Sequence, residues 1–316
     1  MSQHDRIDPE SREPLLALLQ ALPGGFNAIP DIEARRATLY GMLEAMGKDV
    51  PPNENVAKED RTIAGPGGDL PIRIYRPVNA TGQLPGLFFI HGGGMVLGNL
   101  DSDDGVPTML CEALGAIVVS VDYRLAPEHP APAAIDDCYA ALKWMGDAAA
   151  ELGYDPERLA VYGGSAGGGL AIATALMVRD HGGSAISFLM PIYPMIDDRN
   201  ETPSSQEITE VGIWDRAGNI ESWAWYLGGN AADQYAAPTR ATDLTGLPPT
   251  FIDVGEMDMF RDEDIDFANR LMQAGVPTEF HVYPGAYHAS EIFAPTAALS
   301  QRIWATRIAA LQRALA

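Results

Sequence analysis

The chain has 316 residues and a formal net charge of −22, with 47% hydrophobic and 20% charged residues. This composition is typical of a soluble globular protein, and the length suits one large α/β domain with a smaller accessory piece. The negative charge disfavours nucleic acid and anionic membrane surfaces as partners. No run approaches the roughly 18 apolar residues of a membrane span, and no signal pattern precedes the first helix, so we expect a cytoplasmic protein.

The first part of the chain has a helical pattern. Apolar residues recur at helical spacing in 14–22 and 34–46, and the break between them begins at Pro23-Gly24-Gly25. The stretch PPNEN at 51–55 is typical of a linker. The two cysteines, Cys111 and Cys138, fall in later predicted helices without metal or redox spacing, and we expect both to be buried apolar residues.

From about residue 60, predicted strands and helices alternate. The run LPIRIYRP alternates apolar and polar residues, as in a half-exposed edge strand. Short, mostly apolar runs predict buried strands at 86–90, 116–121, 158–163, 185–193, 249–255 and 278–285. Helices are predicted at 103–114, 132–146, 166–181, 262–274 and 296–315. Repeated β-α units indicate a mostly parallel sheet covered by helices on both faces.

One connection is unusually long, with about 55 residues between Tyr193 and Pro249. It contains an acidic loop at 196–210 and a tryptophan-rich helix at 216–227. A long insertion in a compact sheet is usually a lid or a binding loop. We expect it to form a cap together with residues 1–50; ordinary packing of these helices on the sheet is the alternative.

The stretch GGSAG at 163–167 fits G-x-S-x-G, after a predicted strand and before a predicted helix. A nucleophile elbow has this context, because the serine must stand on a strained turn above the sheet. The flanking glycines allow strand and helix to approach closely. A phosphate-binding loop would need a lysine after the glycines, and a linker would not lie between a buried strand and an apolar helix. Ser165 is therefore the candidate nucleophile.

A serine hydroxyl needs a general base, usually a histidine oriented by a carboxylate. Of six histidines, only His288 follows the serine in a loop directly after a predicted strand. The others fall at the terminus, in a proline-rich loop, at a helix end, inside a strand or before a glycine run: His4, His129, His181, His281 and His91. His288 is therefore the candidate base.

The orienting acid should follow the preceding strand, in FIDVGEMDMFRDED. Asp253 lies within the strand, and the acids at 262–264 open the next helix, where carboxylates suit the N-terminal dipole. Asp258 lies in the loop between them and is our choice, with Glu256 as the reserve. The order Ser165, Asp258, His288 is that expected of an α/β-hydrolase.

Backbone amides must stabilise the oxyanion opposite the serine. The run His91-Gly92-Gly93-Gly94 follows the strand at 86–90, and glycines there can turn their amides into a pocket. We expect the oxyanion hole to comprise Gly92, Gly93, Gly94 and Ala166, with Gly93 the surest of the three glycines. His91 is expected to brace this loop by hydrogen bonding.

These motifs together resemble the hormone-sensitive lipase family of α/β-hydrolases, the bacterial family IV esterases. The matching stretches are HGGG at 91–94, DYRLAPEHPAPAAIDD at 122–137, GGSAGGG at 163–169, DMFRDE at 258–263 and YPGAYH at 283–288. The resemblance implies an α/β-hydrolase fold, with a mostly parallel eight-stranded sheet flanked by helices. It also implies N-terminal cap helices at 1–55 and a catalytic domain at 56–316, with a cap insertion at about 200–228.

The resemblance further implies a serine carboxylesterase that hydrolyses short- to medium-chain esters through an acyl-enzyme, without metal or cofactor. An amidase, lactonase or transacylase using the same triad is the alternative, and a non-catalytic small-molecule receptor is a more distant one. Two residues depart from the family: Gly164 stands where Asp or Thr is usual, and Ala289 where Gly is common. Neither departure removes a group that the chemistry requires.

The predicted partner is a small ester. Candidates for lining an apolar pocket are the large side chains Trp214, Trp223, Trp225, Met95 and Tyr193, each of which equally suits the core. A homodimer through an exposed sheet edge is compatible with the sequence, which specifies no interface.

Overall fold

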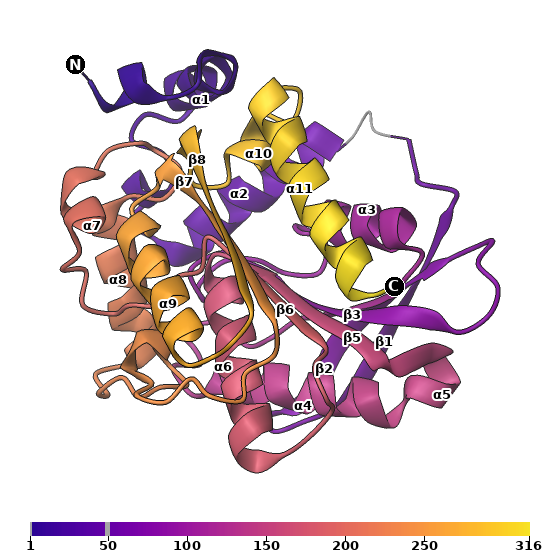
Figure 1. Cartoon of the computed structure of the whole chain (residues 1–316). Coiled ribbons are helices and arrows are strands. Elements are labelled where there is room, and N and C mark those ends of the chain that lie inside the picture. Colours follow the sequence, from indigo (N-terminus) through magenta and orange to yellow (C-terminus); the bar gives the residue numbers. More distant parts are fainter. Residues whose placement is uncertain (1, 48–50) are drawn as a thin grey trace.

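The computed structural model describes residues 2–47 and 51–316. Its centre is an eight-stranded sheet in the order β1-β2-β4-β3-β5-β6-β7-β8 (Figure 1). The strands are β1 (Val56–Gly65), β2 (Gly68–Pro77), β3 (Leu84–Ile90), β4 (Ile117–Val121), β5 (Tyr154–Gly164), β6 (Phe188–Ile192), β7 (Thr250–Met257) and β8 (Thr278–Tyr287). β2 pairs antiparallel with β1 and β4, and the other neighbours are parallel. The predicted mostly parallel, eight-stranded sheet is confirmed.

Helices cover both faces of this sheet. One face carries α3 (Gly105–Leu114) and α11 (Ala298–Ala314), which contact each other, and the other carries α4 (Ala133–Asp147), α6 (Ala166–His181) and α9 (Arg261–Gln273). The short helices α5 (Ala149–Leu152) and α10 (Ser290–Phe293) extend these layers. Because α6 directly follows β5, the C-terminal end of the central strand meets the N-terminus of a buried helix.

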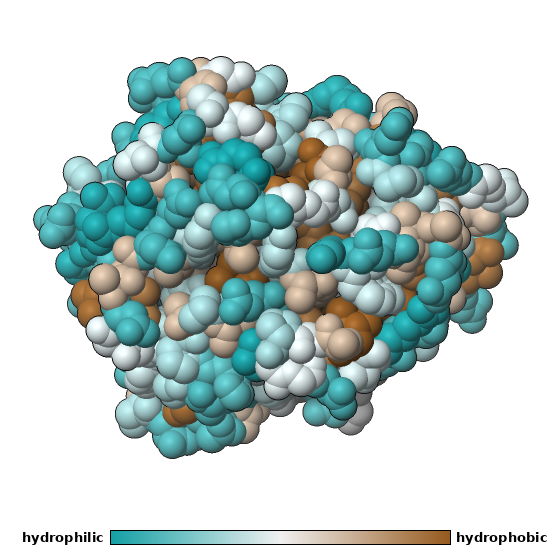
Figure 2. Space-filling view, turned by 90° about the horizontal axis from the view of Figure 1, so that it is seen from below, coloured by the Kyte–Doolittle hydropathy of each residue, from teal (hydrophilic) through white to brown (hydrophobic). Residues whose placement is uncertain are grey.

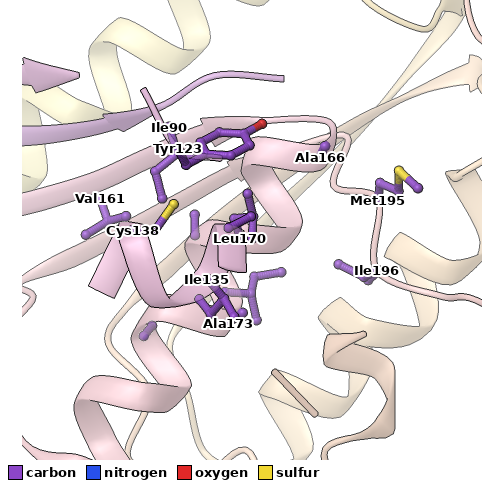
Figure 3. Packing of buried hydrophobic residues seen from close by; sticks show 14 of the residues in the cluster. Ile90, Tyr123, Ile135, Cys138, Val161, Ala166, Leu170, Ala173, Met195 and Ile196 are labelled. Carbon is purple, nitrogen blue, oxygen red and sulfur yellow. The ribbon is translucent and has the colours of Figure 1, made fainter. Parts of the chain in front are cut away.

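Alternation along the central strands explains the two layers. Phe88 and Ile90 belong to the hydrophobic cluster under α4 and α6, whereas Leu87 and Phe89 belong to the cluster under α3 and α11. Successive side chains of a strand point to opposite faces, so a strand covered on both sides is apolar throughout. Figure 3 shows side chains of the first cluster, with Ile90 and Val161 from strands near Leu170 of α6.

The N-terminal helices and the long insertion lie outside these layers. α1 (Pro9–Ala21) lies above the ends of β7 and β8 (Figure 1), and α2 (Ile32–Gly47) follows it. The insertion after β6 holds α7 (Pro203–Glu207) and α8 (Arg216–Leu227). Three single-turn 3-10 helices complete the structure: η1 (Gln3–Arg6), η2 (Phe26–Ala28) and η3 (Pro238–Arg240). Residues 1 and 48–50 of the expected cap lie outside the described residues.

Three sequence-based expectations need correction. The edge strand next to the run at 70–77 is β1, which no apolar alternation predicted, so that run lies inside the sheet. Most side chains of β1 are exposed and many are charged, which hides the strand pattern. α1 begins at Pro9 rather than near Pro14, because Asp8 caps it by accepting from the amides of Glu10 and Ser11. The acidic loop at 196–210 contains the helix α7.

The surface is mixed in character. Seen from below, hydrophilic residues cover most of the face, and hydrophobic residues lie between them in separate groups (Figure 2). Within residues 2–47 and 51–316, no helix is both long and apolar enough to span a membrane. Cys111 and Cys138 are buried free thiols in α3 and α4, as predicted.

Candidate active site

Ser165 occupies a sharp turn between β5 and α6. Its φ of 57° and ψ of −121° are strained values for a residue with a side chain. A Cβ added to Gly163 would lie 2.1 Å from the carbonyl oxygen of Gly167, and one added to Gly167 would lie 2.1 Å from that of Ile90. Only glycine fits at these two positions, so the close approach predicted from the motif is present.

The structure brings the three predicted residues of the triad together. His288 Nε2 lies 3.0 Å from Ser165 Oγ, and His288 Nδ1 lies 2.7 Å from Asp258 Oδ2. The side chains come from three separate connections, after β5, β7 and β8, whose carboxyl ends meet at one edge of the sheet. All three residues are buried. A hydroxyl, an imidazole and a carboxylate in this order can pass a proton from serine to histidine.

The acid and the base of this hydrogen-bonded chain are held in place by further contacts. The second carboxylate oxygen of Asp258 accepts from the amide of Phe260 at 3.0 Å. The His288 ring packs edge-on between Tyr193 and Phe260, with ring centroids 4.8 and 5.3 Å away. Ala289, the next residue, is left-handed at φ 57°, a conformation that explains why glycine suits this position. The imidazole therefore has one preferred orientation.

The other candidate acids have different partners. Glu256, the reserve, bonds Arg6 at 3.0 Å and the amide of Gly285 at 3.1 Å, and Arg6 lowers its pKa. Asp253 receives two hydrogen bonds from the buried Arg307, at 2.7 and 2.9 Å. Neither carboxylate is hydrogen-bonded to His288, so Asp258 is the acid that the geometry favours.

The glycine run after β3 lies directly against the serine turn. A Cβ on Gly92 would lie 3.0 Å from the Gly164 carbonyl oxygen and 3.5 Å from the Ser165 Cβ. Gly93 has φ 104°, and its carbonyl accepts from the amides of Val96 and Leu97, which folds the loop back on itself. In the described part of the chain, the amides at 92–94 donate no hydrogen bond. These amides are therefore free to bind an oxyanion.

His91 supports this loop. Its Nδ1 lies 2.8 Å from the Gly92 carbonyl oxygen, and its ring stacks on Tyr123 at 4.1 Å. The Tyr123 hydroxyl donates to the His91 carbonyl oxygen at 2.9 Å. Complete burial lowers the pKa of His91 to about 4, so the ring stays neutral. The expected bracing role agrees with these contacts.

A largely apolar cavity opens onto Ser165. Its lining residues come from both expected cap segments and from the sheet end, and include Phe26, Leu39, Leu43, Phe89, Tyr162, Tyr193, Ile213, Trp214, Phe293 and Trp304. Trp214 and Tyr193 thus line the cavity as anticipated. Met95 and Trp223 are instead buried in the core, and Trp225 lies under the Arg35 guanidinium. The N-terminal lining residues, Leu39 and Leu43 among them, had no signal beyond helical spacing.

A buried ion network behind the site had no signal in the sequence. Arg307 of α11 donates to Glu291 of α10 at 2.6 Å, and Glu291 accepts from the Tyr193 hydroxyl at 2.7 Å. Arg307 lowers the pKa of Glu291, so both groups stay charged. Through this network, Tyr193, which packs on His288, is hydrogen-bonded to Glu291, which lies only three residues after His288 in the sequence. We infer that it holds the loop carrying His288.

No metal site is evident at residues 2–47 and 51–316, where no group of three or more His, Cys, Asp or Glu side chains is placed to hold an ion. The groups present at Ser165 are a hydroxyl, an imidazole, a carboxylate and free amides. Such a set suits acyl transfer through a serine.

Comparison with known proteins places these features in context. A family model for the alpha/beta hydrolase fold matches residues 87–292. Carboxylesterase NlhH of Mycobacterium tuberculosis is 40% identical over 315 residues, covering 98% of this chain and 96% of that protein. The structure of a bacterial heroin esterase covers 100% of both chains, with a TM-score of 0.93 and 40% identity. The hyperthermophilic esterase of Pyrobaculum calidifontis covers 98% of this chain and 99% of that one, with a TM-score of 0.89 and 35% identity.

Proposed function

The chain belongs to the α/β-hydrolase fold family and is a carboxylic ester hydrolase, and we propose that it acts on short- to medium-chain esters with Ser165 as nucleophile. One observation carries the residue assignment. Ser165, His288 and Asp258 form a continuous hydrogen-bonded chain at the base of an apolar cavity. His288 is present, which disfavours a non-catalytic receptor.

In the first half of the reaction, Ser165 Oγ attacks the ester carbonyl carbon. His288 Nε2 accepts the hydroxyl proton, and Asp258 stabilises the resulting imidazolium through Nδ1. As the new bond forms, the π electrons of the carbonyl group move to its oxygen, which becomes the oxyanion. When the tetrahedral intermediate collapses, the bond to the alcohol oxygen breaks and His288 returns its proton to the leaving alcohol.

In the second half, water replaces the serine hydroxyl as the nucleophile. His288 accepts a proton from water as the water oxygen bonds to the acyl carbon. The second tetrahedral intermediate expels Ser165 Oγ, which takes the proton back from His288 and regenerates the enzyme. The acid product leaves, and no other reactant is required.

The oxyanion is assigned to amides on two sides of Ser165. Ala166 begins α6, where helix amides lack internal partners and the helix dipole favours negative charge. The loop of Gly92, Gly93 and Gly94 supplies the facing donors. Loss of one such donor typically lowers turnover by roughly 10²- to 10³-fold.

The cap and the substrate size are proposed together. We assign residues 1–55 and the insertion at about 200–228 to a cap over the catalytic domain at 56–316. Phe26 and Leu39 from the first segment, with Ile213 and Trp214 from the second, support this assignment because they line the cavity. A cavity covered by two helical segments suits short or medium acyl chains better than bulk triglyceride.

Two further proposals concern where the protein acts and whether it forms a dimer. The protein is proposed to act in the cytoplasm on a freely diffusing ester, without nucleic acid or membrane. A homodimer through an exposed sheet edge is proposed with it; β1 and β8 are the two edge strands. Its molar mass in solution would test this assembly.

An ester panel tests the function directly. The wild type should hydrolyse soluble nitrophenyl esters, and Ser165→Ala should reduce turnover to the uncatalysed background. Ser187→Ala is a matched control, because its hydroxyl donates to the Leu159 carbonyl away from the cavity. Matched amide substrates should react far more slowly. Equal turnover by wild type and Ser165→Ala would contradict the proposal.

A further inference from the structure

One carboxylate lines the otherwise apolar cavity at Ser165. Asp103, in the segment between β3 and α3, borders the same cavity as the nucleophile. It is the one carboxylate among the described lining residues. Placing a charge beside an apolar cavity costs free energy unless a partner compensates it. The presence of the Asp103 carboxylate in this cavity therefore requires a compensating interaction.

Asp103 has no structural role that would explain it. Its one hydrogen bond in the described chain is a long contact of 3.3 Å from the Ser102 hydroxyl. It accepts from no amide, so it does not cap α3, and no described basic side chain pairs with it. By contrast, both flanking acids are paired: Asp101 with Arg73 at 2.9 Å, and Asp104 with Lys58 and Arg73.

The walls near Asp103 suit a cation. Phe89 and Tyr162 line the cavity and stack with ring centroids 5.5 Å apart. Asp103, Phe89 and Tyr162 thus line one cavity together. Aromatic faces attract ammonium groups, and more strongly where water is displaced. An unpaired carboxylate beside aromatic rings is a recognition site for a positively charged, partly apolar group.

We propose that Asp103 selects esters that carry a cationic ammonium group, binding that group while Ser165 attacks the ester carbonyl. This inference rests on the proposed esterase function and names its substrate class. The cation would occupy the space between Asp103 and the aromatic wall. The net charge of −22 adds a long-range attraction for the same substrates.

Partial burial of Asp103 sets the pH range in which its carboxylate is charged. It raises the pKa of Asp103 to about 6, so the group is charged at neutral pH and neutral in mild acid. Asp104 is its neighbour in sequence and His288 lines the same cavity. Burial, with a smaller contribution from the charge of Asp103, also raises the pKa values of the phenols of Tyr40, Tyr123 and Tyr162. These phenols stay neutral throughout the range in which Asp103 titrates.

The test compares isosteric substrates. One pair has a trimethylammonium group or its neutral tert-butyl isostere on the alcohol side, and a second pair has the same groups on the acyl side. The measured quantity is the ratio of kcat/KM for the cationic ester to that for its neutral isostere, corrected for their alkaline hydrolysis rates. We expect Asp103→Asn to lower this ratio at least about tenfold in one pair, because the attraction between two opposite charges near a protein surface exceeds the free energy of a tenfold change. Asp101→Asn, which removes an exposed charge of the same loop, should leave the ratio at the wild-type value.

The pH dependence of the wild type gives a second readout that requires no variant to fold. Both substrates meet the same free enzyme, so effects of pH on the shared catalytic steps cancel in the ratio. The ratio should be constant above pH 7 and fall as pH decreases through about 6, where Asp103 protonates. In Asp103→Asn the ratio should not change with pH.

The outcomes separate this inference from the function on which it rests. If wild type and Asp103→Asn have equal ratios in both pairs, or if the wild-type ratio is independent of pH, the inference is wrong while Ser165-dependent cleavage of the neutral esters leaves the esterase function intact. If no ester is cleaved in a Ser165-dependent way, the proposed function fails and the inference fails with it.

Discussion

Asp258 and Glu256 show how far single residues can be assigned from sequence. Residues two apart at the end of a strand point to the same side, so spacing alone could not separate them. Position in the loop favoured Asp258, and the structure places its carboxylate 2.7 Å from His288 Nδ1. Glu256 instead joins Arg6 to the amide of Gly285. The difference lies in distant partners, which no local pattern contains.

This pair makes a direct prediction. Asp258→Asn should lower kcat by about 10⁴-fold, because the amide would hold His288 in the wrong tautomer. Glu256→Gln should keep kcat near the wild-type value, because Glu256 does not touch the imidazole. Steady-state kinetics on one nitrophenyl ester would measure both. A comparable loss in the two variants would contradict the assignment of the acid.

At the scale of elements, the junction of β5 and α6 was the most predictable part. The G-x-S-x-G motif requires a strand before it and a helix after it. The strand, the turn and the helix all occur where the sequence predicts them. Gly163 and Gly167 have no room for a Cβ, whereas a Cβ on Gly164 would make only ordinary contact with Tyr193 at 3.5 Å. The position that departs from the family is therefore the tolerant one.

The contrast can be tested with two alanine variants. Gly163→Ala should disrupt the turn and destabilise the protein by more than about 1 kcal/mol, because its Cβ would lie 2.1 Å from a backbone oxygen. Gly164→Ala should fold and keep the thermal midpoint of the wild type. Thermal unfolding and soluble yield would measure both. Equal stability of the two variants would show that the turn relaxes more readily than its geometry implies.

The helix α9 contains a buried acidic residue, Asp264. Neither carboxylate oxygen of Asp264 has a hydrogen-bond partner in the described chain, and burial raises its pKa well above 3.8. The folded state therefore retains a proton that the unfolded chain releases. The contribution of Asp264 to stability falls as pH rises above 3.8, because at this group the unfolded state then binds fewer protons than the folded state.

Replacing Asp264 tests this account. Asp264→Asn should raise the free energy of unfolding at pH 8 by more than about 1 kcal/mol, since a tenfold change in acidity is worth about 1.4 kcal/mol. The gain should shrink as pH falls toward 3.8. Asp266→Asn, on the exposed side of the same helix, is the control and should change little. Denaturant unfolding at several pH values would measure this, and a gain independent of pH would contradict it.

Elements without a local signal were predicted less well. β1 escaped prediction because its charged, exposed side chains mask the strand pattern. The network of Tyr193, Glu291 and Arg307 could not be predicted either, because its bond between Tyr193 and Glu291 joins residues 98 positions apart. Buried charges of this kind are visible only when the chain is folded.

At the scale of the whole molecule, the mostly parallel sheet and both helical layers followed from the β-α pattern. The cavity did not, since its walls come from the N-terminal helices, the insertion, α3 and α11 together. Sequence reasoning identified Trp214 and Tyr193 as candidates but could not separate them from Met95 and Trp223, which are buried in the core. Residues that line the cavity and residues that fill the core are both large and apolar, so the sequence pattern does not distinguish them.

The walls of the cavity limit the length of the acyl chain that can bind. Activity on a nitrophenyl ester series should peak at short or medium chains and decline for long ones, because side chains of the proposed cap segments line the cavity. Trp214→Ala should shift the optimum toward longer chains, since the ring lies on the glycine loop beside the nucleophile. Trp225→Ala, which alters a tryptophan outside the cavity lining, is the matched control. A wild-type optimum at long chains would contradict this account of the cap.

The central claim is that Ser165 is the nucleophile, and covalent labelling tests it most directly. The intact wild-type protein would be treated with a fluorophosphonate and analysed by mass spectrometry with peptide mapping. The account predicts one adduct per chain, located on Ser165, with loss of esterase activity in proportion to labelling. It also predicts no adduct on folded Ser165→Ala. An adduct elsewhere that accompanies inactivation, or full activity after Ser165 is labelled, would contradict the claim.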